Sequence, residues 1–450
     1  MTRRSPRALG VAALVIATVL VRSAEAGNQE AVFLGNQAAM SGGAVVAWVS
    51  DGGAPWYNPA GLATIERTSV DLSASAFVLR HYALPDAART TIDDRVIAED
   101  ASFTEVVSVP AALTVMRKLT DELSGALAVF VPYQEDLLVA GSFARSRPDL
   151  QYEWSFSASR RAARYYAGPA LGLALGHGMQ VGLSIFGTYE TRLTARDFYS
   201  SFVAPGRGIS RAVNTVDQKL DSKLFGTSWV LGWRWDIDPD WSAGVVLRSP
   251  VLHLAGKSDV DFSATAALAD QSGQSLIDSA SGELDEEPDR FAFMQPGRIQ
   301  VGLSRALAGG RLSAQVEYSS AATGGGDVRK PTVNGRVGGA FPVSDRFALG
   351  GGLFTDRSQN VDPRDLGETK IHFYGGSFGG QFRTAHDVEQ EDDEEEDRGL
   401  VFSTTIALRY AIGLGDIGGL TFSPAVPPEL TVADVTVHEV SVHIGSALDF

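Results

Sequence analysis

The run of short amphipathic segments is the feature that most constrains what this 450-residue chain can fold into. Beyond residue 68, apolar and polar side chains alternate in one segment after another, which is the period-2 pattern of a strand with two unlike faces. In one segment, for example, Trp229, Leu231 and Trp233 share a face. Fourteen segments show this pattern, at about residues 69–80, 104–118, 121–134, 163–177, 178–192, 225–238, 240–250, 292–307, 310–321, 332–343, 344–356, 369–383, 399–413 and 434–450.

The gaps between these segments are long and short in turn. The long gaps include 81–103, 135–162, 193–224 and 251–291, and the short ones include Thr120, His177-Gly178, Asp238-Pro239-Asp240 and Ala308-Gly309. A transmembrane barrel has this asymmetry, with short turns at one end and long loops at the other, whereas a soluble sandwich or lectin-like array has no reason for it. Lipid offers no hydrogen-bond partners, so the sheet must close. We therefore predict an all-β chain: a fourteen-stranded antiparallel transmembrane β-barrel over 69–450, with long extracellular loops.

The last segment and one pair of neighbouring segments give further support. Val440, Val442 and Ile444 alternate with polar residues up to the terminal Phe450. A final aromatic residue on an amphipathic strand resembles the signal that barrel-assembly machinery recognises, which makes that machinery an expected partner. Three tryptophans, Trp233, Trp235 and Trp241, flank one short turn, where an interfacial aromatic girdle is expected.

The first 26 residues read as a secretory signal peptide. Three arginines precede the only long apolar run, Leu9 to Val21, and Ala24-Glu25-Ala26 provides a cleavage site after Ala26. The alternative is an N-terminal membrane anchor, which the shortness of the run and Arg22 disfavour.

Composition excludes several classes of site. The chain has no cysteine, so disulfides, thiolate metal sites and a lipid-carrying cysteine are excluded. Its net charge of −16 argues against nucleic-acid binding. No motif for a metal, cofactor or phosphate is evident, and we expect none of these groups.

The acidic segment 384–398 breaks the alternation of gaps, because it stands where a short turn is expected. Nine carboxylates occupy eleven positions from Asp387 to Asp397. Either this acidic turn faces the periplasm, or the strand count is off by one nearby. A solvated loop is the plainer interpretation, and a site for a divalent cation or a basic partner is the sharper one, although the spacing matches no calcium loop.

Residues 27–68 form a separate N-terminal unit, rich in glycine and other small residues, which suits a tightly packed plug. The unit ends in Asn58-Pro59-Ala60-Gly61, where Asn-Pro and the nearby glycine mark a compact turn. Following a leader and preceding fourteen strands, this motif resembles the Asn-Pro-Ala motif of the FadL/TodX family of outer-membrane transporters for long-chain fatty acids and other hydrophobic compounds. The resemblance implies a small hatch inside the barrel.

A second part of the resemblance lies in the third predicted strand. Its end, Phe130-Val131-Pro132-Tyr133, is similar to the aromatic-x-Pro-aromatic run of the family. In the family this strand kinks and opens a lateral gap in the wall. Pro132 cannot donate a hydrogen bond to a sheet, so a local break there is physically reasonable. The substrate-path and gating residues implied by the resemblance are Asn58, Pro59, Ala60, Gly61, Phe130, Pro132 and Tyr133.

An enzyme is not expected. The best catalytic candidates are His438 and His443 with Ser441 and Glu439, but alternation places His438 on the face opposite His443 and Ser441. Charged residues within the strands are expected to line the lumen and satisfy one another; they include Glu190, Arg192, Arg234, Arg248, Glu317 and Arg336.

The resemblance implies passive uptake of hydrophobic small molecules, such as fatty acids or hydrocarbons, across the outer membrane of a Gram-negative cell. The outer loops would capture the molecule, the hatch would rearrange, and exit would be sideways through the wall. Lipid and lipopolysaccharide would surround the barrel. Two alternatives remain at this point: a non-transport barrel that acts as surface adhesin or receptor, and an aqueous porin.

Overall fold

A computed structural model describes residues 32–92, 95–148, 150–205, 209–286, 293–324, 327–363, 368–386, 399–422 and 429–450. The expected leader, residues 1–26, and the acidic run 387–397 lie outside the described residues. Among the described residues, no helix has the length and apolar character needed to cross a membrane.

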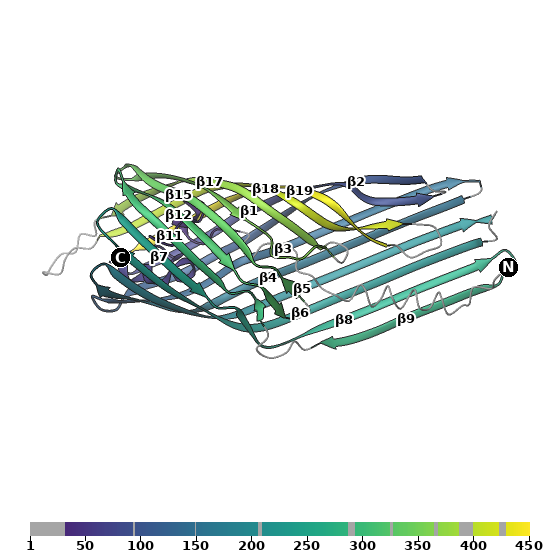
Figure 1. Cartoon of the computed structure of the whole chain (residues 1–450), viewed down its shortest axis with the longest axis horizontal. Helices are drawn as coiled ribbons and strands as arrows, with labels where there is room; N and C mark the ends of the chain where they lie inside the picture. Colours follow the sequence, from purple (N-terminus) through teal and green to yellow (C-terminus); the bar gives the residue numbers. More distant parts are fainter. Residues whose placement is uncertain are drawn as a thin grey trace.

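Fourteen wall strands form one closed antiparallel barrel, as predicted (Figure 1). β19 pairs with β1 from Ser69–Asp449 to Ala83–Thr436, which closes the wall and removes the exposed edges of an open sheet. Twelve wall strands are single elements: β1 (Ser69–Ile92), β2 (Arg95–Lys118), β3 (Leu123–Arg147), β4 (Leu150–Gly176), β5 (Met179–Ala204), β6 (Ile209–Asp236), β12 (Gly310–Ser319), β15 (Thr332–Ser344), β16 (Phe347–Asp356), β17 (Thr369–His386), β18 (Leu400–Phe422) and β19 (Glu429–Asp449).

The seventh and eighth wall strands are each built from several pieces. β7 pairs with the last residues of β6, from Val230 to Asp236, and β8 pairs with the part of β6 before them. Pro250, which cannot donate a hydrogen bond to a sheet, separates β7 from β8. The pieces are β7 (Trp241–Arg248) with β8 (Val251–Asp270), and β9 (Ser275–Glu286) with β10 (Phe293–Gln295) and β11 (Arg298–Leu307). A separate small hairpin consists of β13 (Ala322–Gly324) and β14 (Asp327–Arg329).

The two ends of the barrel differ. At one end, here called the turn end, short connections join β2 to β3, β4 to β5 and β11 to β12, and the Phe450 N–H donates to the carbonyl of Thr68 (2.9 Å). His386 and Leu400, which flank the acidic run, also pair at this end. The strand count is therefore correct, and β17 and β18, which flank the acidic run in the sequence, meet at the turn end.

At the opposite end, here called the hairpin end, the prediction of long loops is wrong for most of the chain. Segments 81–103, 135–162 and 193–224 are largely continuous strand, and most of 251–291 belongs to β8 and β9. The resulting hairpins carry β3 to β6, β8 and β9 far beyond the rest of the wall (Figure 1). Along β4, Tyr152, Trp154 and Phe156 point inward between exposed polar residues, so the alternation continues with its apolar face turned inside.

Nearer the turn end the apolar face points outward. Leu231 is 44% exposed on β6, and Phe225 and Trp235 bound this face. Ten residues of a tilted strand separate Phe225 from Trp235, which gives a band of about 25 Å at a rise of ~3.4 Å and a tilt of ~40°. Tyr165, Tyr189 and Phe225 stack across β4, β5 and β6 at the hairpin side of the band, with ring centroids 6.2 and 4.7 Å apart. This is the aromatic edge of a membrane-spanning band.

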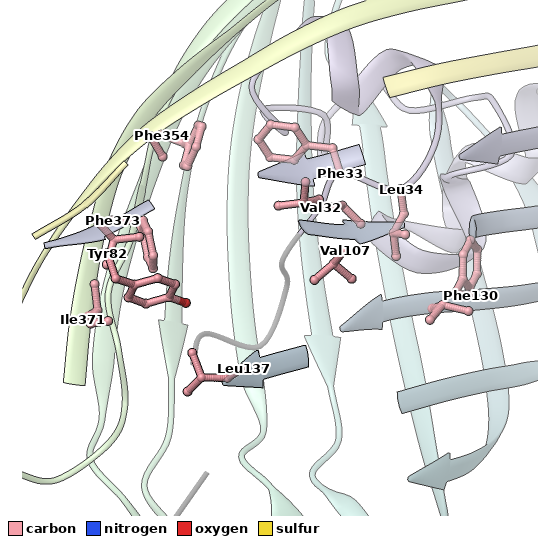
Figure 2. Packing of buried hydrophobic residues seen from close by; sticks show 14 of the residues in the cluster. Val32, Phe33, Leu34, Tyr82, Val107, Phe130, Leu137, Phe354, Ile371 and Phe373 are labelled. Atoms are coloured by element: carbon pink, nitrogen blue, oxygen red, sulfur yellow. The ribbon is translucent and has the colours of Figure 1, made fainter. Parts of the chain in front are cut away.

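The N-terminal segment, residues 32–68, lies inside the wall. It consists of α2 (Asn36–Met40), α3 (Ala54–Tyr57) and the 3-10 helix η1 (Pro59–Thr64). Val32, Phe33 and Leu34 are buried in one cluster with wall residues such as Val107 and Phe354 (Figure 2). The Phe33 and Phe354 rings meet edge to face, with centroids 5.3 Å apart. The segment is thus the core of the barrel's turn half.

Candidate functional site

The side chain of Asn58 connects parts of the N-terminal segment with each other and with the wall. Its Nδ2 donates to the carbonyl oxygens of Val46 (2.7 Å) and Trp233 (3.2 Å), and its Oδ1 accepts from the Ala60 N–H (3.1 Å). The first bond connects the Asn58 turn to Val46 in another part of the segment, the second connects it to β6, and the third closes the turn itself. Asn58 and the next three residues of the motif are fully enclosed. The Asn-Pro-Ala-Gly turn is therefore a buried joint between segment and wall.

Wall side chains hold the same segment from several directions. Gln315 Oε1 on β12 accepts from the N–H groups of Val45 (3.0 Å) and Val46 (3.1 Å). Ser184 Oγ on β5 donates to the Pro55 carbonyl (2.8 Å). These bonds satisfy backbone groups that no helix or strand of the segment could satisfy, which a buried irregular chain requires.

Inward-facing glycines let the segment lie directly on the wall. A side chain at Gly182 on β5 would overlap Pro59, and one at Gly232 on β6 would overlap Asn58. Glycines also face the segment on other strands, where a Cβ would overlap its backbone or side chains: Gly172, Gly244, Gly338, Gly352 and Gly445. The segment therefore lies directly against the inner surface of the wall strands.

An aromatic cluster links the segment to the third and fourth strands. Trp56 contacts Phe130 and Tyr166, with ring centroids 5.4 and 5.0 Å away, and Phe186 of β5 completes the group. The Arg248 guanidinium lies 3.8 Å from the centroid of the Trp56 ring. Since Phe130 belongs both to this cluster and to β3, the segment and strand three are in direct contact.

Strand three contains a bulge immediately after Phe130. Phe130 is opposite Tyr166 on β4, but Tyr133 is opposite Arg164, so β3 has one extra residue here. The inward positions change from even to odd numbers across this point, and Val131 and Pro132 are both buried. The sequence therefore predicted the place of a local break correctly.

The ladder between β2 and β3 also ends at this level. Its register runs from Lys118–Ser124 to Ala112–Phe130, and among the described residues no pair follows. Continued by two residues, the register would set Pro110 against Pro132, and neither proline has an N–H. We call the gap between residues 105–111 of β2 and 131–136 of β3 the seam.

The seam borders the outward apolar band. Next to it, Leu79 of β1 and Val106 of β2 are paired and exposed (42 and 59%). On the inner side, Phe130 and Tyr133 are buried. The seam thus lies between the aromatic cluster inside the barrel and an apolar surface outside it.

A belt of buried ion pairs lies inside the wall on the hairpin side of the aromatic cluster. Glu135 pairs with Arg160 (3.2 Å), and Glu190 pairs with Arg164 (2.8 Å) and Arg192 (3.2 Å). All six charged residues expected to line the lumen are found there or elsewhere on the inner surface: Glu190, Arg192, Arg234, Arg248, Glu317 and Arg336. The charged side chains of the belt can be buried because each of them is paired with a group of opposite charge.

The turn-end mouth is polar. Two cavities of about 370 and 290 Å³ lie between the N-terminal segment and the wall there, and they share Gln37, Gln381 and Arg383. The larger cavity is also lined by three further arginines, Arg234, Arg311 and Arg346.

The catalytic candidates of the last strand do not assemble. His443 and Ser441 face inward, and His443 Nε2 is 3.2 Å from Asn36 Oδ1. His438 faces outward and bonds Tyr410 Oη (2.9 Å), whereas Glu439 pairs with Arg80 and Arg409. Within the described ranges, no group of three or more His, Asp or Glu side chains is arranged to hold a metal ion.

Sequence reasoning missed Pro110, Trp56 and Phe186. A signal for Pro110 was present, since it interrupts a segment that otherwise alternates. Its position opposite Pro132 depends on the pairing of two strands, which the pattern of one strand does not contain.

Comparison with known proteins agrees with this geometry at the level of the fold. No protein-family model matches the chain, and no curated protein sequence matches it. A FadL homologue of Pseudomonas aeruginosa is similar in structure, with a TM-score of 0.58 and 12% identity over 94% of this chain and 100% of the other. The toluene transporter TodX of Pseudomonas putida has a TM-score of 0.53 and 12% identity, over 92% and 98% of the two chains. The monoaromatic hydrocarbon channel CymD has a TM-score of 0.52 and 11% identity, over 93% and 97%. The chain therefore has the fold of the FadL and TodX barrels.

Proposed function

We propose that this barrel takes up hydrophobic small molecules passively across the outer membrane and releases them sideways through the seam. The observation that carries the proposal is the break in the β2–β3 ladder beside Pro110 and Pro132, between an aromatic cluster inside and an apolar surface outside. A continuous ladder would leave an apolar molecule no route into the bilayer.

Capture is assigned to the hairpin end. The inward face of β4 and β5 presents Trp154, Phe156, Phe198 and Phe202 among smaller apolar residues. These buried side chains belong to the segments 135–162 and 193–224, so the proposed capture surface is a β-sheet rather than a set of loops. An apolar molecule gains free energy on leaving water for such a surface, in proportion to the apolar area that it buries.

Passage requires the N-terminal segment to act as a hatch. Trp56 and the Asn58–Gly61 turn lie against the wall next to Phe130, so a small shift of the turn would open space toward the seam. The polar turn-end mouth, whose larger cavity is lined by four arginines, disfavours exit of an apolar molecule along the barrel axis. Lipid is the better acceptor, and no energy source is needed.

The substrate class follows from this chemistry and from the neighbours. Those neighbours are a FadL homologue, a toluene transporter and a monoaromatic hydrocarbon channel. Fatty acids or hydrocarbons are therefore the proposed substrates. Lipid and lipopolysaccharide are the proposed surroundings of the apolar band, in a Gram-negative outer membrane that the chain reaches by way of its leader and of barrel-assembly machinery acting on Phe450.

Uptake by cells that lack other transporters of this class tests the proposal. We expect cells carrying the barrel to accumulate labelled toluene or a labelled long-chain fatty acid, and cells with Asn58→Ala or Pro132→Ala to accumulate less. Pro169→Ala is the matched control, because Pro169 is exposed on β4 and the β3–β4 ladder continues through it without a break. Unchanged uptake in both site variants would contradict the gating mechanism. Steady ion conductance in planar bilayers would instead indicate an aqueous porin, and binding of a surface ligand without uptake would indicate an adhesin or receptor.

A further inference from the structure

A buried side chain spans the seam on its hairpin side. Glu105 of β2 is 4% exposed, and its Oε1 accepts a hydrogen bond from the backbone N–H of Asp136 on β3 (2.8 Å). This bond takes the place of a ladder bond, since β2 and β3 have no paired residues at this level. Below it, the next residues of the two strands that are paired are Ala112 and Phe130. The seam is therefore a bounded window, with a backbone pair at one edge and a side-chain bond at the other.

Two residues of β1 hold Glu105 in this position. Its Oε2 accepts from Arg80 Nη1 (3.4 Å) and from Tyr82 Oη (3.3 Å). Arg80 in turn bonds Glu439 on β19 through its Nε (2.5 Å). Arg80 lies directly opposite Glu105 on β2 and Glu439 on β19, so the three side chains form one row across three strands. The Glu105 carboxylate, which accepts from β3, is thus held in place by side chains of β1, which is paired with β2 at this level.

We propose that Glu105 is a latch that sets the size of the window, and hence the width of molecule that can leave through the wall. The inference rests on the proposed lateral route and adds the residue that regulates it. A hydrogen bond from an amide to a carboxylate is strong enough to order the strand, yet it can break without disturbing the β1–β2 and β3–β4 ladders on either side. With the bond broken, β3 is free to move away from β2 beyond Phe130.

Hydrogen exchange tests the latch without requiring transport. In Glu105→Ala, the amide of Asp136 should exchange at least about tenfold faster than in the wild type, the order of change expected when a hydrogen bond to a charged group is lost. Glu105→Gln keeps a carbonyl oxygen for this N–H and should retain most of the protection. Amides of the Ala112–Phe130 pair serve as the internal control, and their exchange should be unchanged. Equal protection of Asp136 in all three proteins would overturn the proposal.

Selectivity tests what the latch does. Glu105→Ala should raise the ratio of bulky to slim uptake, measured with a polycyclic hydrocarbon and toluene, several-fold over the wild type. Glu105→Gln, which keeps an acceptor for the Asp136 N–H, should leave this ratio near the wild-type value. Leu113→Ala is the control, because Leu113 is an exposed residue of β2 that is paired with Val129 below the seam, and it should leave the ratio unchanged. A ratio that does not respond to Glu105→Ala contradicts the latch, whereas absence of all uptake in the wild type contradicts the proposed function instead.

Discussion

Pro110 of β2 and Pro132 of β3 each lie two residues beyond the last pair of their common ladder, Ala112–Phe130. Neither residue can donate a hydrogen bond, so the two strands lose their connection from both sides at the same level. The neighbouring ladders shift register there as well, between Phe130 and Tyr133 on β3 and between Ser73 and Val78 on β1. The wall is therefore interrupted where the sequence removes two donors.

The close contact between the N-terminal segment and the wall predicts that two Gly→Ala substitutions differ in their effect on stability. Gly232→Ala places a Cβ against Asn58 and should destabilise the folded barrel by about 1–3 kcal/mol, the usual cost of overpacking. In Gly335→Ala the added Cβ meets no neighbouring atom, so that variant is the control. Thermal unfolding of the refolded proteins measures both. Equal midpoints would show that the segment does not rest on β6 as described.

The apolar band predicts that the cost of a charge depends on its depth. Leu231→Arg, near the middle of the band, should destabilise the barrel by about 2–4 kcal/mol, and Phe225→Arg, at its aromatic edge, by about 0–1 kcal/mol. Denaturant unfolding in lipid vesicles checks the difference. A larger cost at Phe225 would mean that the band has been placed wrongly along the strands.

A pH dependence is expected from Asp51 in the N-terminal segment. Its carboxylate accepts from the Gln37 (2.7 Å) and Gly53 (3.0 Å) N–H groups, and burial raises its pKa above the ordinary value of 3.8. Because the folded-state pKa is the higher one, the stability that the protonated group contributes is complete below pH 3.8 and is lost as the pH rises through the raised value.

Asp51→Asn should therefore weaken the loss of stability that the wild type shows as the pH rises above about 4, as read from thermal unfolding midpoints. Asp71, whose carboxylate accepts from the Gly52 N–H, interacts electrostatically with Asp51, so the comparison measures the effect of Asp51 together with its influence on Asp71. An identical pH profile in the two proteins would show that Asp51 ionises normally in the folded state.

The number and order of the wall strands could be predicted because each membrane-spanning strand has an apolar face outside and a polar or small face inside. The hairpin extensions were missed for the same reason. In 150–158 the alternation continues, but Trp154 and Phe156 face inward and the outer face is polar, so these residues resembled a loop. Alternation alone gives two faces and does not say which one meets lipid.

Local structure at the candidate site could be predicted where single residues carry the signal, while the role of these residues stays a prediction. The Asn58 turn has a recognisable composition, and Pro132 has no N–H to donate, which favours a break in the ladder beside it. The β2 side of the seam, with Pro110 and Glu105, could not be predicted, because register between strands depends on the closed wall. The hydrogen bond from the Asp136 N–H to Glu105 could not be predicted from the sequence either, because any side-chain acceptor of suitable length could make it.

Repair of the ladder tests the central claim most directly. The double variant Pro110→Val, Pro132→Val restores both N–H groups, which allows β2 and β3 to pair across the seam. If apolar molecules leave through the seam, uptake of labelled toluene by cells carrying the folded double variant falls to the level of cells without the barrel, while Pro169→Val keeps wild-type uptake. Wild-type uptake by a double variant whose β2–β3 amides have become protected from hydrogen exchange would contradict the lateral route.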